Sequence, residues 1–323
     1  MDQPTPADPA TQSIVDVDSH VEVDIDGGKV LDPSMTRLRL DIGYDGTDFF
    51  GWGKQPALRT VQGTIEDALG VIFRRFGVIP SLVVAGRTDA GVHASGQVAH
   101  LDLTEAQLRS LDRPRRGNLR GKRYDGPASL ARRINGIVGL EADIHVSKSE
   151  IAAGGFDARF SPLWRRYEYR IADNESPRDP RYRNHTVWYP ATLDVDAMNV
   201  AANELLGLHD WAAYCKPREG ASTVRRLEHF SWRHNEEGII VAEVRADAFC
   251  HSMVRSLVGA GVFVGQGKLE ISRPVEIRDE RSKGSEYKVM PAKGLTLVEV
   301  GYPADDGLAA RAELTRSHRA PMD

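Results

Sequence analysis

The sequence predicts an α+β fold built around a mostly antiparallel sheet. Strand-like segments with alternating apolar residues and helix-like segments with apolar residues at helical spacing both recur along the chain. Consecutive strands are often joined by connections too short for a parallel crossover, which favours antiparallel pairing. The second half of the chain repeats the order of elements found in the first half, so we expect two related halves.

Length and composition are those of a globular protein. The chain has 323 residues, of which 41% are hydrophobic and 27% charged, enough for one large core or two smaller ones. No stretch approaches the roughly 20 uncharged apolar residues that a membrane helix needs. The N-terminus, Met1–Pro4, is acidic and proline-containing rather than basic and then apolar, as a signal peptide would be. We therefore expect a cytoplasmic protein without a membrane partner.

Charge is distributed unevenly along the chain. The net charge is −4, but residues 1–36 hold eight acids and one base, which leaves 41 bases and 38 acids in the rest. We expect residues 1–36 to be an acidic tail, 37–155 an N-terminal half, 156–303 a C-terminal half and 304–323 a C-terminal tail. Residues 109–133 hold nine bases and two acids between glycines and a proline. We expect the first part of this segment to be a loop whose bases from Arg113 to Arg123 bind phosphate, with a merely solvated loop as the alternative.

In the first half, the expected elements are a strand at 37–42, a helix at 61–76, and strands at 82–85 and 97–103. The first strand alternates apolar and polar residues and stops at turn-forming residues. Thr60 is a suitable N-cap for the helix, and Gly77 stands where a C-terminal cap belongs. Gly86 and Gly91 mark a loop between the later strands.

In the second half, the expected elements are a strand at 165–171, a helix at 194–206, a hairpin around 235–238, a helix at 251–264 and a strand at 295–300. Cys215 and Cys250 are too few for a disulfide framework and lie in no metal-binding pattern, so we expect two buried free thiols. Four histidines show no metal spacing and are expected to be surface or hydrogen-bonded core residues: His93, His100, His185 and His251.

Three residues could carry chemistry. Asp89 follows a buried strand in a glycine-flanked loop, where a substrate can approach, although a turn-capping aspartate is the alternative. Arg255 lies in an otherwise apolar helix and needs an anion, either a functional carboxylate or a structural partner elsewhere. Tyr167 lies on the apolar face of a strand between arginines, as a core residue or as a platform for a nucleic-acid base.

Segments in order along residues 37–303 resemble the tRNA pseudouridine synthases of the TruA type. The most specific, Ala85–Ala94 with Gly96–Val98, resembles the catalytic signature of that family. The other matching segments are Tyr44–Thr47, Gly51–Trp52, Arg59–Gly63, Phe156–Phe160, Arg165–Tyr169, Phe249–Arg255 and Gly294–Leu297.

This resemblance implies two ferredoxin-like α/β halves that share a mixed sheet, with an active-site cleft between them. It also implies a homodimer that binds tRNA and isomerises uridine to pseudouridine at positions 38, 39 and 40 of the anticodon stem-loop, with neither cofactor nor metal.

The resemblance further assigns roles to single residues. Asp89 matches the nucleophile, Tyr167 the tyrosine that stacks on the target base, and Arg255 the arginine paired with the aspartate. Arg87 matches the residue that takes the place of the flipped base. Substrate contacts are implied at Phe156, Asp157, Ala158, Arg159 and Phe160, and by a looser match at 218–222, with Arg218 and Ser222 as the candidates.

Two other functions compete with this interpretation. Asp45-Gly46-Thr47 after a strand is similar to the first motif of haloacid-dehalogenase phosphatases, but their nucleophile would fall on Gly43, which has no side chain. A non-catalytic RNA-binding protein of the same fold is the remaining alternative. The presence of Asp89, Tyr167 and Arg255 argues against it.

Overall fold

The structure is a computed structural model that describes residues 31–112, 126–218, 220, 222–281 and 284–317. Most of the expected acidic tail and the central part of the expected phosphate-binding loop lie outside these ranges. The last six residues of the expected C-terminal tail do so as well.

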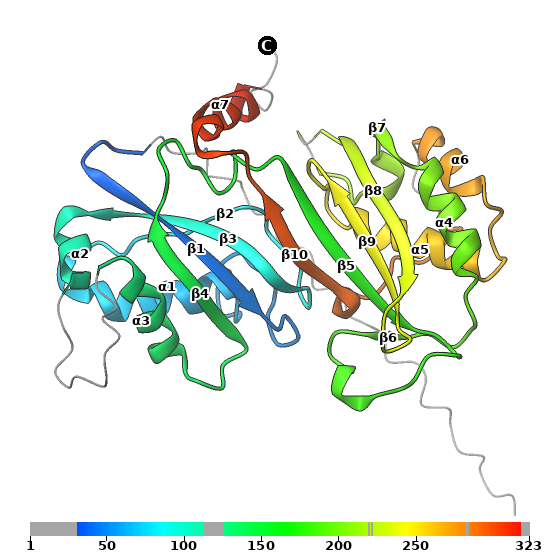
Figure 1. Cartoon of the computed structure of the whole chain (residues 1–323), viewed down its shortest axis with the longest axis horizontal. Helices are drawn as coiled ribbons and strands as arrows, with labels where there is room; N and C mark the ends of the chain where they lie inside the picture. Colours follow the sequence, from blue (N-terminus) through cyan, green and yellow to red (C-terminus); the bar gives the residue numbers. More distant parts are fainter. Residues whose placement is uncertain (1–30, 113–125, 219, 221, 282–283, 318–323) are drawn as a thin grey trace, which may run out of the picture. The chain divides into compact units, whose positions relative to one another are not determined.

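One open sheet of ten strands runs through the described chain (Figure 1). The strands are β1 (Met35–Tyr44), β2 (Val83–Val84), β3 (His93–Thr104), β4 (Ile144–Ile151), β5 (Trp164–Ala172), β6 (Val187–Trp188), β7 (Gly207–Asp210), β8 (Val224–His234), β9 (Ile240–Ala246) and β10 (Leu295–Gly301). Their order is β4-β1-β3-β10-β5-β9-β8-β7, while β2 pairs with β3 and β6 with β5. Within the described ranges only β10–β3 and β5–β6 are parallel. The expected α+β fold with a mixed, mostly antiparallel sheet is therefore confirmed.

Helices pack against the strands of both halves (Figure 1). They are α1 (Val61–Phe73), α2 (Glu105–Arg109), α3 (Ala128–Val138), α4 (Val195–Glu204), α5 (Met253–Gly265), α6 (Arg273–Glu280) and α7 (Leu308–Ser317). Helix α1 begins where the sequence predicts, because Thr60 Oγ1 accepts a hydrogen bond from the Gly63 amide at 3.2 Å. Its Ile65 and Leu69 are fully buried. No helix in the described part of the chain is long and apolar enough to cross a membrane.

Strand β10 joins the two halves into one sheet. It pairs with β3 of the first half on one side, where Leu297 lies opposite Ala94, and with β5 of the second half on the other, where Leu297 lies opposite Tyr167. The β3 backbone approaches β10 so closely that a Cβ on Gly96 would overlap the carbonyl oxygen of Val298. Only glycine fits at this contact.

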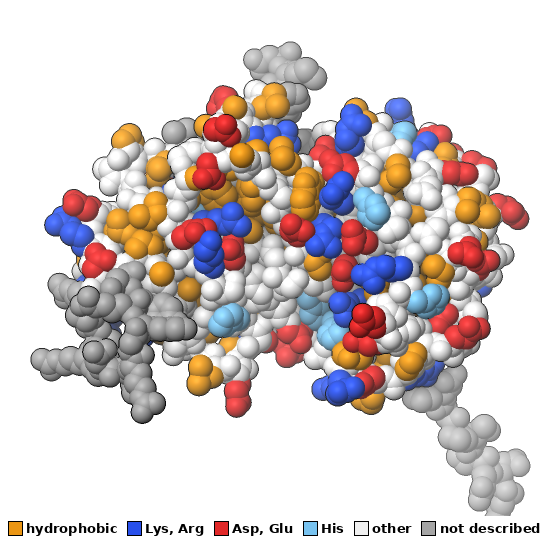
Figure 2. Space-filling model, viewed as in Figure 1, with side chains coloured by type: hydrophobic (Ala, Val, Ile, Leu, Met, Phe, Trp, Pro, Cys, Tyr) orange, Lys and Arg blue, Asp and Glu red, His pale blue; other side chains and the backbone are white. Residues whose placement is uncertain are grey.

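The two faces of the sheet differ in polarity. Along β5, residues 165, 167, 169 and 171 are buried, whereas residues 164, 166, 168 and 170 are partly exposed. On the exposed face, Arg166 pairs with Glu299 at 2.9 Å and with Glu243 at 3.4 Å. Figure 2 shows cationic and anionic side chains interspersed over this face. Tyr167, one of the residues that could carry chemistry, therefore lies on the opposite, buried face.

The expectation of two free thiols is wrong. Cys215 and Cys250 form a disulfide, with Cα atoms 5.8 Å apart. The two segments run side by side, because the amide of Lys216 donates to the carbonyl oxygen of His251 at 3.0 Å. A separation of 35 residues in the sequence carried no sign of this contact.

Four helices of the described residues, α2, α3, α6 and α7, occupy segments where the sequence predicted none. Helix α3 follows the expected loop and packs on α1 and β4. Helix α7 occupies part of the expected C-terminal tail and buries Leu308 and Ala312. The guanidinium of Arg316 pairs with the carboxylate of Asp157 at 2.9 Å, which anchors the end of α7 to the second half.

We expect Gly96→Ala to lower the free energy of unfolding by about 1–3 kcal/mol, because the added methyl group forces β3 away from β10. Gly136→Ala is the matched control. Gly136 lies in α3, where an added Cβ would meet open space, and this exchange should stabilise the chain by up to about 1 kcal/mol. Urea denaturation of both variants measures the difference. Equal stability of Gly96→Ala and the wild type would contradict the close pairing of β3 and β10.

His100 should make stability depend on pH. Its Nδ1 accepts a hydrogen bond from the Ala158 amide at 3.0 Å. Burial, and then the charge of Arg37, lower the pKa of His100 from 6.5 to about 4. The unfolded chain therefore takes up this proton before the folded chain does, so stability falls as the pH falls from 6.5 towards 4.

His100→Asn keeps an acceptor for the Ala158 amide and removes the titration. We expect the free energy of unfolding of this variant to fall less steeply between pH 6.5 and 4, by up to about 1.4 kcal/mol per pH unit. The slopes, rather than the absolute stabilities, are compared by urea denaturation. Parallel curves for wild type and variant would show that folding does not lower the pKa of His100.

Candidate active site

Asp89 lies in a loop that backbone hydrogen bonds attach to a neighbouring segment. The amide of Trp52 donates to the carbonyl oxygen of Thr88 at 3.0 Å, and the amide of Gly91 donates to that of Phe49 at 3.2 Å. Gly91 has a φ of +75°, a conformation that glycine adopts without strain. The loop therefore presents Asp89 from a fixed backbone.

Buried polar side chains fix the same loop from inside. The hydroxyl of Tyr44 lies 2.8 Å from Oγ1 of Thr88. Gln97 Nε2 donates to this hydroxyl at 3.3 Å and to the carbonyl oxygen of Gly86 at 2.9 Å. Burial raises the pKa of Tyr44 to about 12, so the phenol keeps its proton at neutral pH. This network contains no charged group, so the partners of the Asp89 carboxylate must be other residues.

Two basic side chains approach the carboxylate of Asp89, one at each oxygen. Nη1 of Arg255 lies 3.5 Å from Oδ2, and Nε2 of His251 lies 3.5 Å from Oδ1. Asp89 is about one-third exposed, so a substrate can reach it. Nε of Arg255 donates to the carbonyl oxygen of Met290 at 2.7 Å, which directs the other end of the guanidinium to Asp89. The structure thus brings together Asp89 and Arg255, which are 166 residues apart.

Tyr167 lies beside this group on the inner face of β5. It is buried, and its ring meets that of Phe249 edge to face, with centroids 5.2 Å apart. Burial raises the pKa of Tyr167 above its usual value of 10, and nearby Tyr44 and Asp89 add to this effect. Tyr167 is therefore a neutral phenol next to the carboxylate.

His251 is a site residue that the sequence interpretation missed. Its backbone is held against the segment around Cys215 by the hydrogen bond from the Lys216 amide and by the Cys215–Cys250 disulfide. Ser252 then adopts a positive φ of 64° immediately before α5 begins. The only signal in the sequence was the position of His251 four residues before Arg255, which places the two on one side of a helix or its first turn.

The segment Phe156–Phe160 is mostly buried. The side chain of Asp157 is almost inaccessible, and its Oδ1 accepts hydrogen bonds from the amides of Arg159 and Phe160 at 2.9 and 3.0 Å. The side chains of Phe156, Ala158 and Phe160 are also buried. Arg159 is the member of this segment whose side chain is partly exposed. The other members shape the segment instead of presenting their side chains to solvent.

The remaining expected contact residues are exposed. Arg87 projects from the Asp89 loop, and Arg218 and Ser222 lie in the segment before β8. This segment starts beside the site, because Lys216 bonds to His251. Within the described ranges, no cluster of three or more His, Cys, Asp or Glu side chains is arranged to hold a metal ion.

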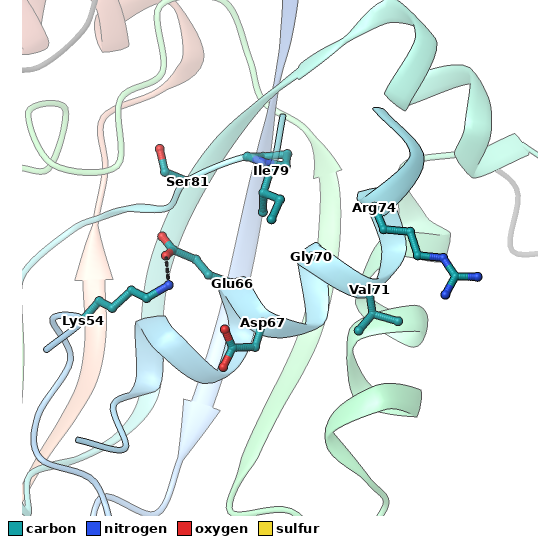
Figure 3. Close-up of a pocket in the computed structure, with 9 residues that line it drawn as sticks. Lys54, Glu66, Asp67, Gly70, Val71, Arg74, Ile79 and Ser81 are labelled. Carbon is teal, nitrogen blue, oxygen red and sulfur yellow. Dashed lines mark ion pairs between the residues drawn. The ribbon is translucent and has the colours of Figure 1, made fainter. Parts of the chain in front are cut away.

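A separate hollow of about 500 Å³ lies along the outer side of α1 (Figure 3). Lys54 and Glu66 face each other at its edge, with Nζ and Oε2 3.6 Å apart. Neither Asp89 nor any residue of its group lines this hollow. It is therefore distinct from the site around Asp89.

Comparison with known proteins identifies the family of the chain. A family model described as tRNA pseudouridine synthase matches residues 201–303. A protein of Leifsonia xyli named tRNA pseudouridine synthase A is 60% identical over 286 residues, which cover 88% of this chain and 98% of the relative. Proteins of the same name from Streptomyces griseus and Streptomyces avermitilis are 47% and 49% identical, and each alignment covers 89% of this chain and 95% of the relative. With this identity over nearly the whole length of its relatives, the chain belongs to the tRNA pseudouridine synthase A family of isomerases.

Proposed function

We propose that the chain isomerises uridine to pseudouridine at positions 38, 39 and 40 of the tRNA anticodon stem-loop, with Asp89 as the nucleophile. The observation that carries this proposal is the environment of Asp89. Its carboxylate is accessible, its backbone is fixed, and Arg255 and His251 face its two oxygens. The choice of these three positions rests on the family resemblance.

The reaction breaks the C1′–N1 bond of uridine and forms a C1′–C5 bond. N1 gains a proton and C5 loses one, so that the product is an isomer of the substrate. An ionised carboxylate can attack the ribose C1′ or the uracil C6, or assist a route through a glycal. Arg255 faces the Asp89 carboxylate and orients it in each of these routes.

Tyr167 is suited to stacking on the target base. Because its pKa is raised, it is not a phenolate base at neutral pH. It can pass on the C5 proton only by accepting it while giving up its own.

Binding requires that the target uridine leave its helical stack, which costs a few kcal/mol. Arg87 is exposed two residues before Asp89, where it can fill the space that the base leaves. Arg159, Arg218 and Ser222 have accessible side chains that can contact the RNA backbone.

Two further parts of the proposal rest on the resemblance. We infer that the chain acts as a homodimer in which both subunits contact one tRNA, and sedimentation at micromolar concentration tests this. We also infer that it acts in the cytoplasm. The alternative is an RNA-binding protein that lacks catalysis, and the Asp89 variant below separates the two.

Asp89→Asn should abolish turnover while leaving tRNA affinity within about threefold, because the amide keeps the shape of the side chain and loses the nucleophile. Tritium release from tRNA labelled at uridine C5 measures turnover, and filter binding measures affinity. Residual turnover above about one hundredth of the wild-type rate would contradict the role of Asp89. A wild-type chain that binds tRNA without releasing tritium would favour the non-catalytic alternative.

Arg255→Ala should lower kcat by about 100-fold or more, because it removes the cation that orients the attacking carboxylate. Affinity for tRNA should change little, since Arg255 is mostly buried behind Asp89. Arg233→Ala is the control, because Arg233 pairs loosely with Glu168 at 3.8 Å on the exposed face of the sheet. A fall in kcat of less than about threefold would place the function of Arg255 elsewhere.

A further inference from the structure

The guanidinium of Arg165 contacts the residue that leads into the Asp89 loop, because it donates to the carbonyl oxygen of Ala85. Arg165 is on the inner face of β5, two residues before Tyr167, and is 9% exposed. A Cβ placed on Gly86 of the Asp89 loop would lie 4.0 Å from its Nε. Arg165 therefore fills the space between β5 and this loop.

Arg165 binds three carbonyl oxygens from three separate segments. Nη1 donates to the carbonyl oxygen of Asp247 at 2.8 Å. Nη2 donates to that of Ala85 at 2.8 Å and to that of Arg159 at 3.4 Å. No carboxylate of the described residues lies within ion-pair distance of Arg165. Backbone carbonyls are thus its hydrogen-bond acceptors, and the more distant carboxylate of Asp247 adds a favourable charge.

Each of these carbonyls belongs to a segment that carries part of the site. Ala85 directly precedes the Asp89 loop. Asp247 begins the segment that leads to Phe249 and His251, and Arg159 lies in the segment implied in RNA contact. The loop comes from the first half of the chain and the other two segments from the second.

Burying the charged guanidinium of Arg165 costs free energy unless its N–H groups are hydrogen-bonded. Burial lowers the pKa of Arg165 from its usual 12.5, yet an arginine keeps its proton at neutral pH. Charge-assisted hydrogen bonds in several directions are what such a buried cation requires. Only the planar, forked guanidinium offers donors at these angles, whereas a lysine ammonium reaches fewer of the carbonyls.

We propose that Arg165 is a positioning residue that sets the Asp89 loop against the His251 and Arg159 segments through the carbonyl oxygens of Ala85, Asp247 and Arg159. This inference rests on the proposed function, because it concerns the geometry of the proposed nucleophile. Arg165 aligns the reacting groups across the two halves and does not itself contact the substrate.

The test is the effect of Arg165→Lys on kcat and on tRNA affinity, measured separately. We expect kcat to fall by about 100-fold, since a displacement of about 1 Å at the reacting groups has this effect. The dissociation constant for tRNA should stay within about threefold, because the exposed contact residues are unchanged. Tritium release at saturating tRNA and filter binding are the two measurements, with the full chain throughout.

Arg278→Lys is the matched control. Arg278 is similarly buried, at 8% exposure, but lies in α6 and bonds to Asp279 at 2.8 Å. We expect this variant to keep wild-type kcat. Arg165→Gln, which carries no charge, is the second variant if the lysine variant does not fold, and the same separation of kcat from affinity is expected.

Three outcomes would overturn the positioning role. These are a kcat within about threefold of wild type in Arg165→Lys, an equal loss of kcat in Arg278→Lys, and loss of the folded state in both Arg165 variants. A wild-type chain that releases no tritium would instead refute the proposed function. The two failures are therefore distinguishable.

Discussion

The insertion of β10 between β3 and β5 is the interaction on which the site depends. This strand comes from the end of the described fold but pairs with the first half on one side and the second half on the other. It thereby turns two sheets into one and brings the Asp89 loop to the side of β5 that carries Tyr167. The requirement for glycine at position 96 follows from how closely the two backbones approach.

Fixed polar groups surround a single accessible carboxylate. Tyr44 and Gln97 are neutral, and the guanidinium of Arg165 donates its hydrogen bonds to carbonyl oxygens, so none of the three pairs with the Asp89 carboxylate. The basic side chains that do face Asp89 come from α5 and the turn before it. Such an arrangement separates the groups that hold the loop from those that set the charge of the reacting atom, which is how preorganised sites function. On the opposite, exposed face, pairs such as Arg166–Glu299 contribute little to stability.

The sequence by itself determined α1, α4, α5, several of the strands and the nucleophile candidate. Helix α1 follows from its apolar spacing and the Thr60 cap, and the alternation in β5 placed Tyr167 on the buried face. These signals are local, so they are readable from neighbouring residues. The position of Asp89 after a buried strand, in a glycine-flanked loop, is of the same kind. The sequence did not predict the burial of Phe156 and Asp157, which the resemblance implied as RNA contacts. Both side chains are buried, and Asp157 accepts a hydrogen bond from the Arg159 amide.

Only the tertiary structure decided which distant residues meet. His251, Arg255 and Asp89 converge because α5 packs behind the loop, and no periodicity encodes that contact. No local pattern predicts three other contacts either. These are the Cys215–Cys250 disulfide, the ion pair between Arg316 of α7 and Asp157, and the hydrogen bonds from Arg165 to three carbonyl oxygens. Each depends on the pairing of strands far apart in the chain, and such long-range packing is set by the whole core instead of by any one segment.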